Sequence, residues 1–232
     1  DVAILLGELQ GALEMVHGVR QVAEGPARVA GLLQRPAQQR AGGEGVRNGE
    51  RLASAIHQSQ ADGQLRAEHF IHLRCELPCD NVLGMTEAFI DDPHVRLVSL
   101  MDHTPGQRQW MNVEKFRVHT QRNQRWTEEH LAQVVAERQG MRGRNAERNR
   151  EALLALCVDR NLAVASHDDT LVEHIHEGVE AGISISEFPT TELAARTARE
   201  HRMKIVMGAP NLVRGGSHSG NVSALELAPH DL

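Results

Sequence analysis

From about residue 51 onward, the chain alternates between short apolar runs and longer segments with helical spacing, and no other feature restricts the fold as much. The apolar runs predict five strands, over 66–74, 95–102, 162–167, 183–187 and 204–209. The remaining segments predict helices near 50–62, 81–90, 111–160, 170–180 and 190–201. Helices of this length can join parallel strands by right-handed crossovers, so the alternation predicts an α/β fold with a parallel sheet. Such units suit either a doubly wound sheet or part of an eight-stranded barrel, and the spacing alone does not decide.

Composition excludes several classes of protein. With 232 residues and 41% hydrophobic content, the chain is long enough for one large domain with a buried core. A formal charge of −6 and a pI near 6.2 argue against binding to nucleic acid or anionic membranes, which requires broad positive surface. No apolar run reaches the roughly 20 residues that span a bilayer, so we expect a soluble protein. The cysteines Cys75, Cys79 and Cys157 are odd in number and lack paired zinc spacing, which favours a reducing cytoplasm.

Two segments of different composition precede the alternating region. Apolar residues recur at helical spacing within 1–33, at Leu5, Leu6, Leu9, Leu13 and Val16, which predicts helices. Residues 34–50 are rich in Gln, Arg and Gly and predict a loop or linker. We therefore expect 1–50 to be a weakly structured segment that adds little to the core, and 51–232 to form the main domain. Because the chain opens with Asp1 and lacks a basic leader segment, we expect a fragment.

Polar side chains stand where the predicted strands end. They are Glu76 after HFIHLRC, Asp102 and His103 after VRLVSLM, His167 after LAVAS, and Glu187 after ISIS. In a barrel of alternating strands and helices, catalytic groups lie at the carboxyl ends of the strands. A sequence in which each apolar run is followed by His, Asp or Glu is therefore the pattern expected for such an active site. His72 and Arg74 alternate on the same side of their strand as Glu76.

Each of these residues also has an ordinary structural interpretation. Asp168 or Asp169 could cap the next helix, whose start is predicted by a capping box of Thr170 and Glu173. Glu76 could be a solvated strand-end carboxylate, and Glu187 could face the dipole of the following helix. We assign no function to the histidines in helical stretches, which are His119, His130, His174, His176 and His201.

A glycine-rich loop follows the last predicted strand. Within MGAPNLVRGGSHSGNVSA, at 207–224, it carries Arg214, Ser217, His218 and Asn221. Glycine lets backbone N–H groups approach an anion, and an arginine supplies a bidentate cation, so the loop could hold a phosphate. Its spacing matches neither familiar glycine-rich phosphate loop, which leaves a plain connection as the alternative.

The long motifs SLMDHTPGQRQ, RAEHFIHLRCE, ASHDDT, ISISEFPTTE and MGAPNLVRGGSHSGNVSA together resemble one family. It is the diphosphatase family of the carbon–phosphorus lyase pathway, within the amidohydrolase superfamily, and the resemblance extends over about 52–227. It implies a TIM-like (β/α)8 barrel and hydrolysis of α-D-ribose 1-methylphosphonate 5-triphosphate to the 5-phosphate and pyrophosphate. The family's His-rich first barrel strand and its last, Asp-bearing strand have no counterpart here, so the resemblance implies an incomplete barrel.

The resemblance also implies roles for the polar residues. Divalent zinc, manganese or iron would be bound by Glu76, His167 and Glu187, because His and carboxylate ligands suit all three metals. Catalysis would involve Asp102, His103 and Asp168. A phosphorylated ribose substrate would contact Arg74, Arg214, Ser217, His218 and Asn221. We expect no nucleic-acid or membrane partner, and a homo-oligomer stays open.

Two alternatives to this function remain at the level of sequence. One is another amidohydrolase that acts on a cyclic amide or an acylated sugar, although such an enzyme has no need of Arg214 in a glycine loop. The other is a catalytically inactive, truncated chain, which the missing first and last strands favour.

Overall fold

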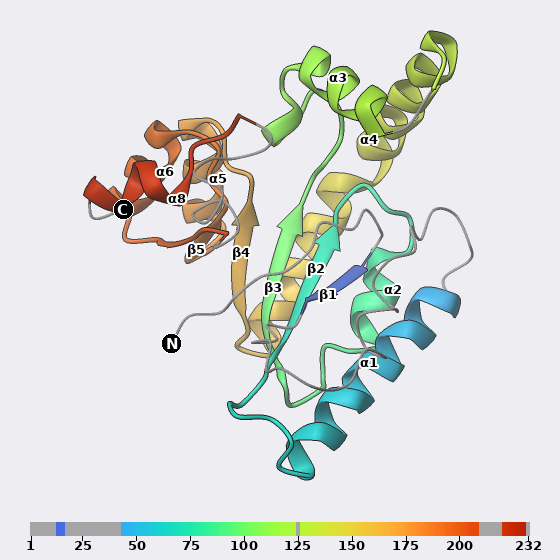
Figure 1. Ribbon diagram of the computed structural model, residues 1–232, viewed down its shortest axis with the longest axis vertical. Coiled ribbons are helices and arrows are strands. Elements are labelled where there is room, and N and C mark those ends of the chain that lie inside the picture. Colours follow the sequence, from blue (N-terminus) through green and yellow to red (C-terminus); the bar gives the residue numbers. More distant parts are fainter. Residues whose placement is uncertain (1–12, 17–42, 124–125, 209–219, 231–232) are drawn as a thin grey trace.

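A six-stranded sheet forms the centre of the structure (Figure 1). The computed structural model describes residues 13–16, 43–123, 126–208 and 220–230. The strands lie in chain order and are β1 (Leu13–Val16), β2 (Ile71–Glu76), β3 (Val95–Met101), β4 (Ala163–His167), β5 (Ile185–Glu187) and β6 (Lys204–Val206). The pairing of β1 with β2 is antiparallel, and every later pair is parallel. The predicted parallel α/β sheet is therefore confirmed.

Helices connect the parallel strands. The helices are α1 (Gly43–Ala61), α2 (Val82–Glu87), α3 (Val113–Asn123), α4 (Glu128–Asp159), α5 (Val172–Glu180), α6 (Glu192–Glu200) and the short α8 (Ala224–Leu227), with 3-10 turns η2 (Arg108–Trp110) and η3 (Ala228–His230). Side-chain caps fix two of the starts: Thr127 accepts a hydrogen bond from the His130 N–H, and Thr191 accepts one from the Ala194 N–H. Among the described helices, none is both long and apolar enough to cross a membrane.

The main core lies on one face of the sheet. Alternate strand residues such as Leu73, Val98 and Val164 point to this face, where they pack with apolar residues of α1, α2, α4, α5 and α6. A doubly wound sheet would reverse its strand order and carry helices on both faces. Strands in chain order with these helices packed on a single face are instead consistent with a TIM-like fold.

The other set of alternating strand residues includes several polar side chains that are still buried. These are His72, Arg74, Ser99, His167 and Glu187, each no more than 8% exposed. Since buried polar groups must find partners, this set predicts a hydrogen-bonded network at the sheet.

The structure corrects the expectation for the N-terminal region. Residues 13–16 form a strand paired with β2, not a helix, because the exposed edge of β2 offers backbone partners that outweigh helical spacing. Helix α1 begins at Gly43, inside the segment predicted to be a loop, and Val46 packs against the core. Thus 43–50 do contribute to the core. The proposed boundary between 50 and 51 stays a prediction.

Two local expectations were also wrong. The first parallel strand begins at Ile71, later than the predicted 66. The capping box of Thr170 and Glu173 does not form; instead the His174 imidazole Nδ1 accepts hydrogen bonds from the N–H groups of Thr170 and Leu171. The imidazole of His174 thereby satisfies orphan donors at the helix start, as a Glu side chain would in a capping box.

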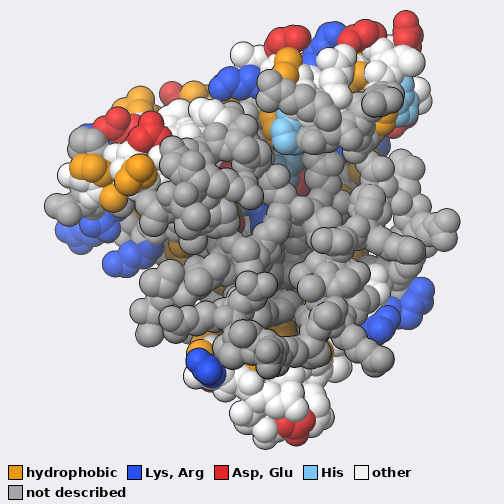
Figure 2. Space-filling view, in the orientation of Figure 1, with side chains coloured by type: hydrophobic (Ala, Val, Ile, Leu, Met, Phe, Trp, Pro, Cys, Tyr) orange, Lys and Arg blue, Asp and Glu red, His pale blue; other side chains and the backbone are white. Residues whose placement is uncertain are grey.

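Acidic and basic side chains are interspersed on the described surface around α3 and α4, at the top of Figure 2. Exposed pairs such as Arg117 with Glu128 lie on these two helices. The exposed surface of these two helices therefore carries charges of both signs.

Candidate functional site

The carboxyl ends of β2, β3, β4 and β5 bring the predicted residues together. Glu76, His167 and Glu187 are the last residues of their strands, and His103 follows β3 closely. His167 and Glu187 are paired in register across β4 and β5. The predicted convergence of these four residues is therefore confirmed by the strand register and by the contacts described below.

His103 is held by Glu76. The backbone N–H of His103 donates to Glu76 Oε1 at 2.8 Å, and its Nδ1 donates to Oε2 at 2.6 Å. Burial opposes the charged imidazole, yet the negative charges of Glu76 and Asp168 outweigh it and raise the pKa of His103 well above its usual value. Burial also works against the Glu76 carboxylate, but the charge and hydrogen bonds of His103 lower its pKa. The two groups thus form a partly buried ion pair.

Helix α4 supports the position of Glu76. Asn145 Nδ2 donates to the Pro78 carbonyl at 2.9 Å, and Asn149 Nδ2 donates to the carbonyls of Leu77 and Cys79, both at 2.8 Å. These two buried amides satisfy the carbonyls of the turn that follows β2. The turn after Glu76 is therefore fixed by α4.

His167 is held in the same way by Glu187. His167 Nδ1 donates to Glu187 Oε2 at 2.7 Å, and Ser99 Oγ donates to the same oxygen at 2.7 Å. Burial disfavours the Glu187 carboxylate, but its electrostatic interaction with His167 and the hydrogen bond from His167 Nδ1 lower the pKa of Glu187 strongly. Behind Ser99, His72 Nε2 lies within hydrogen-bond reach of Ser99 Oγ, and burial lowers the pKa of His72 to about 4. His72 is therefore neutral at pH 7.

Asp168 lies between the two histidines. Its Oδ2 is 3.5 Å from His103 Nε2 and 3.5 Å from His167 Nε2. Within the described part of the chain, this buried oxygen has no hydrogen-bond partner. Asp168 also has a φ of 54°, a left-handed conformation that is uncommon outside glycine and is concentrated at functional sites. The backbone thus holds a carboxylate oxygen against two imidazole nitrogens.

This donor set fits a divalent cation. Ligands about 2.0 to 2.2 Å from a tetrahedral metal are separated from one another by roughly 3.3 to 3.6 Å, close to the two distances at Asp168 Oδ2. Metal-binding histidines usually donate their other N–H to a carboxylate, and both His103 and His167 do so here. The orphaned oxygen of Asp168 and the two Nε2 atoms are therefore the atoms best placed to bind a metal.

Arg74 stands beside the same group. Its Nη2 donates to His167 Nε2 at 3.2 Å, and the residue is 6% exposed. Because Nδ1 of His167 already donates to Glu187, the lone pair of Nε2 accepts this bond in the metal-free chain, and a metal bound at Nε2 would take the place of the Arg74 N–H. A positive guanidinium therefore lies next to His167, and its charge helps to lower the pKa of the Glu187 carboxylate.

Asp102 makes different contacts. Its Oδ2 accepts from Arg142 Nε of α4 at 2.7 Å, and its Oδ1 accepts from the Thr104 N–H at 3.1 Å. The Asp102 carboxylate is thus held by α4 and by the following turn, whereas its neighbour His103 turns to Glu76 and Asp168. A catalytic role for Asp102 stays a prediction.

Part of the predicted phosphate loop lies outside the described residues, namely Arg214, Ser217 and His218. Asn221 is described and half-buried. The next residue, Val222, donates its N–H to the Thr190 carbonyl at 2.9 Å, in the segment between β5 and α6. Asn221 is therefore close to the carboxyl end of β5, on the side of the sheet where the metal-ligating residues were predicted.

Sequence analysis gave no role to three members of the network. Ser99 was not singled out, and His72 was noted only as lying on the same side of its strand as Glu76, although the alternation of polar residues along both strands was a signal. A helix cap was one interpretation of Asp168 or Asp169; in the structure, Asp169 Oδ2 accepts from Ser166 and Ser186, and its Oδ1 accepts from Arg108. Asp169 therefore ties β4 to β5 beneath the candidate metal ligands.

Comparison with known proteins agrees with the motif resemblance. The chain is 48% identical over 189 residues to alpha-D-ribose 1-methylphosphonate 5-triphosphate diphosphatase of Escherichia coli (strain K12). The match covers 82% of this chain and 50% of the relative, so the chain spans about half the length of the protein that it matches. No family model matches the chain, and no solved structure matches it. The resemblance inferred from the sequence motifs is confirmed as similarity to this enzyme.

Proposed function

We propose that the chain carries part of a metal-dependent hydrolase that cleaves α-D-ribose 1-methylphosphonate 5-triphosphate to the 5-phosphate and pyrophosphate. The observation that carries this proposal is the group formed by Asp168 Oδ2 and the Nε2 atoms of His103 and His167. The 48% identity to the diphosphatase supports the choice of substrate. The five parallel strands support assignment of the fold to an amidohydrolase-type (β/α)8 barrel.

The geometry supports a different division of roles from the one that the sequence implied. His103, His167 and Asp168 would bind the metal, while Glu76 and Glu187 would orient the two imidazoles and increase their basicity. A bound divalent ion would lower the pKa of a coordinated water at this position. His and carboxylate ligands are compatible with zinc, manganese or iron.

The substrate would approach as a polyanion. Arg74 supplies a buried positive charge beside His167, and Arg214, Ser217, His218 and Asn221 would add donors from the glycine-rich loop. Arg74 would thus offset part of the negative charge that three carboxylates place at the site. We propose that the protein is soluble and cytoplasmic and that it acts on a small phosphorylated sugar.

A binding-only function is the second candidate, and one observation favours it. The chain spans 50% of the length of its relative. If residues outside this span complete the catalytic site in the relative, the chain alone would bind metal but would not release pyrophosphate. Metal content and pyrophosphate release therefore have to be measured on the same preparation.

The experiment compares the parent chain with His167→Asn and with His176→Asn, an exposed histidine of α5 that serves as the control. Each protein is stripped with a chelator, reloaded with Zn²⁺ or Mn²⁺, and assayed for pyrophosphate release from the ribose triphosphate. We expect release by the parent and the control, and a loss of more than about 100-fold in His167→Asn, because a metal ligand is removed. Metal uptake without release would support the binding-only function. Equal metal uptake by parent and His167→Asn would contradict the assignment of the site.

A further inference from the structure

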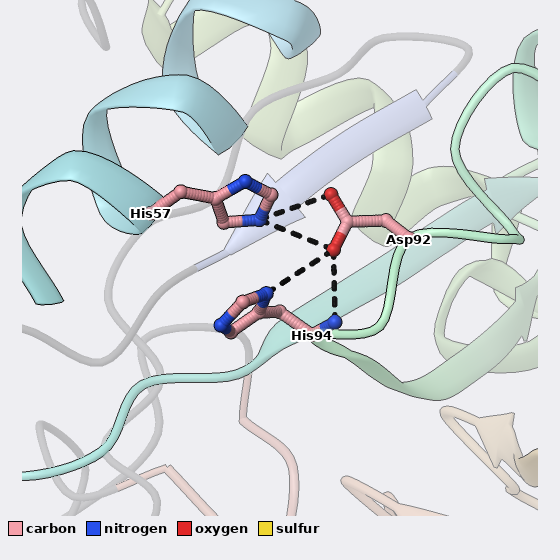
Figure 3. A group of neighbouring side chains, drawn as sticks. All are labelled: His57, Asp92 and His94. Atoms are coloured by element: carbon pink, nitrogen blue, oxygen red, sulfur yellow. Dashed lines mark hydrogen bonds and ion pairs between the residues drawn. The ribbon is translucent and has the colours of Figure 1, made fainter. Parts of the chain in front are cut away.

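A second group of possible metal ligands lies at the opposite end of β3. It consists of His57 on α1 and of Asp92 and His94, which belong to the loop that leads into β3 (Figure 3). The candidate site described above follows the carboxyl end of β3, whereas His94 directly precedes its first residue, Val95. The two groups are therefore separated by the length of a strand, and neither shares a residue with the other.

All three side chains point toward one another in Figure 3. His57 Nε2 is 3.1 Å from Asp92 Oδ1 and 3.1 Å from Oδ2, and His94 Nδ1 is 3.4 Å from Asp92 Oδ1. The two imidazole rings lie side by side, with centroids 4.3 Å apart. These separations are close to the roughly 3.3 to 3.6 Å expected between neighbouring ligands of a tetrahedral metal.

One atom of the group points to a missing ligand. His94 Nδ1 is buried and makes no hydrogen bond within the described part of the chain. A buried polar atom without a partner is rare because its desolvation is uncompensated. At 3.4 Å and in this orientation, the nearest Asp92 oxygen does not satisfy it. A cation placed between the three side chains would provide the missing partner of His94 Nδ1.

The backbone already holds two of the ligands in place. Asp92 Oδ1 accepts from the His94 N–H at 2.8 Å, the Asp92 carbonyl accepts from the Val95 N–H at 2.9 Å, and the His94 carbonyl accepts from the Ile71 N–H at 2.8 Å. Pro93 restricts the backbone between Asp92 and His94. The pair is thus preorganised against β2 and β3, and His57 reaches it from the neighbouring α1.

We propose that His57, Asp92 and His94 bind a divalent transition metal of the zinc class, which ties α1 to the amino-terminal end of the sheet. Two imidazoles and one carboxylate are a common zinc ligand set, and they leave one position for water. The imidazole content selects against Mg²⁺ and Ca²⁺, which prefer oxygen ligands. Because α1 is joined to the core mainly by apolar contacts such as those of Ala53 and Ile56, the ion adds a cross-link between α1 and the loop before β3.

The test measures Zn²⁺ binding to the purified full chain after removal of metal by a chelator. The double variant His57→Gln/His94→Gln is compared with the parent and with His176→Gln, which removes an exposed histidine outside both groups. We expect the parent and the control to bind one more Zn²⁺ per chain than the double variant. Co²⁺ in place of Zn²⁺ should give the visible absorption of a four-coordinate ion, and the double variant should lose that share of the signal.

Thermal unfolding provides the second readout. Zn²⁺ should raise the Tm of the parent, since a ligand that binds the folded state stabilises it, and the part of the rise that comes from this group should be absent in the double variant. The single variant His94→Phe, which keeps an aromatic ring of similar size but carries no ligand atom, covers the case in which the double variant does not fold. Equal Zn²⁺ stoichiometry in parent, single and double variants would overturn the proposal and leave His57 and Asp92 as an ordinary ion pair. Because the variants leave His103, His167 and Asp168 intact, this result is independent of the proposed hydrolase activity.

Discussion

The two ends of β3 carry groups with similar donor atoms but very different surroundings. At the carboxyl end, the side chains of His167, Asp168 and His103 are 4%, 7% and 21% exposed. At the amino end, those of Asp92, His94 and His57 are 15%, 29% and 37% exposed. Each imidazole at the carboxyl end has a carboxylate behind it, and the amino-end group relies on backbone hydrogen bonds. The comparison indicates that one group is built to control the charge and orientation of its ligands, and the other to hold two segments together.

The difference in negative charge is equally instructive. The carboxyl-end group brings Glu76, Asp168 and Glu187 close to two histidines, and the amino-end group has Asp92 alone. Three carboxylates at one partly buried site repel one another unless cations compensate them. The protein therefore places Arg74 and a charged His103 there, and a metal would complete this compensation.

Asp168→Asn should have the largest effect on metal binding at the carboxyl end of β3 while leaving the amino-end group unchanged. Asparagine tolerates the left-handed φ of 54° and keeps the side-chain volume, so the fold should persist while the charged ligand is lost. Loss of a residue that only orients a ligand typically lowers metal affinity by about 10- to 100-fold. Because Asp168 would itself be a ligand, we expect metal affinity at the carboxyl end to fall by more than about 100-fold. Isothermal titration with Zn²⁺ measures this affinity, and the unchanged group of His57, Asp92 and His94 serves as the internal reference. Unchanged affinity would mean that Asp168 is not a ligand.

Glu76→Gln should weaken the same site less. The amide still accepts a hydrogen bond from the His103 backbone N–H, but the negative charge that raises the pKa of His103 is gone. We expect metal affinity to fall by about 10- to 100-fold, the range for partners that orient a ligand. Histidine NMR titration should show a lower pKa for His103 in the metal-free variant. A shift in the opposite direction would rule out the ion pair.

Acid stability should depend on the carboxyl-end group in the metal-free protein. The folded-state pKa values of Glu76, Asp168 and Glu187 are lowered, so their contribution to stability is present above the carboxyl pKa of the unfolded chain and is lost as the pH falls. Urea unfolding from about pH 7 to pH 3 should show stability decreasing below about pH 5. Glu187→Gln should flatten this decrease, and an equally steep curve in the variant would contradict the assignment.

Asp102→Asn should have the smallest effect on metal binding. Its carboxylate is held by Arg142 and by the turn at Thr104, away from the nitrogens of His103 and His167 that face Asp168. We expect metal content to stay the same and unfolding free energy to fall by about 1 kcal/mol, since Arg142 is 41% exposed and its ion pair is screened by solvent. Loss of metal in Asp102→Asn would place this residue in the metal site after all.

The sequence predicted the parallel strands because each one combines an apolar run with a helix signal, and it predicted the convergence of Glu76, His103, His167 and Glu187 because parallel strands end at one edge. It could not separate ligands from orienting carboxylates. That distinction depends on which oxygen faces which imidazole nitrogen, and residue type alone carries no such information. The strand at 13–16 was missed because its formation depends on a free edge of β2 that is distant in sequence.

The amino-end group was missed for a related reason. His57 belongs to a helix that sequence analysis described only by its spacing, and Asp92 and His94 lie in an ordinary polar loop between helix and strand. Only the packing of α1 beside the start of β3 brings them together. By contrast, the carboxyl-end residues follow a rule of the fold class, so their meeting could be foreseen.

The central claim is that opposite ends of β3 hold two independent metal sites, and counting the bound ions tests it most directly. Equilibrium dialysis against Zn²⁺ followed by elemental analysis is carried out on the parent, Asp168→Asn, His57→Gln/His94→Gln and the triple variant that combines these substitutions. The structure predicts that each variant loses one ion relative to the parent, and that the triple combination loses both. If all of these proteins bind the same amount of Zn²⁺ per chain, neither group is a metal site and the claim is wrong.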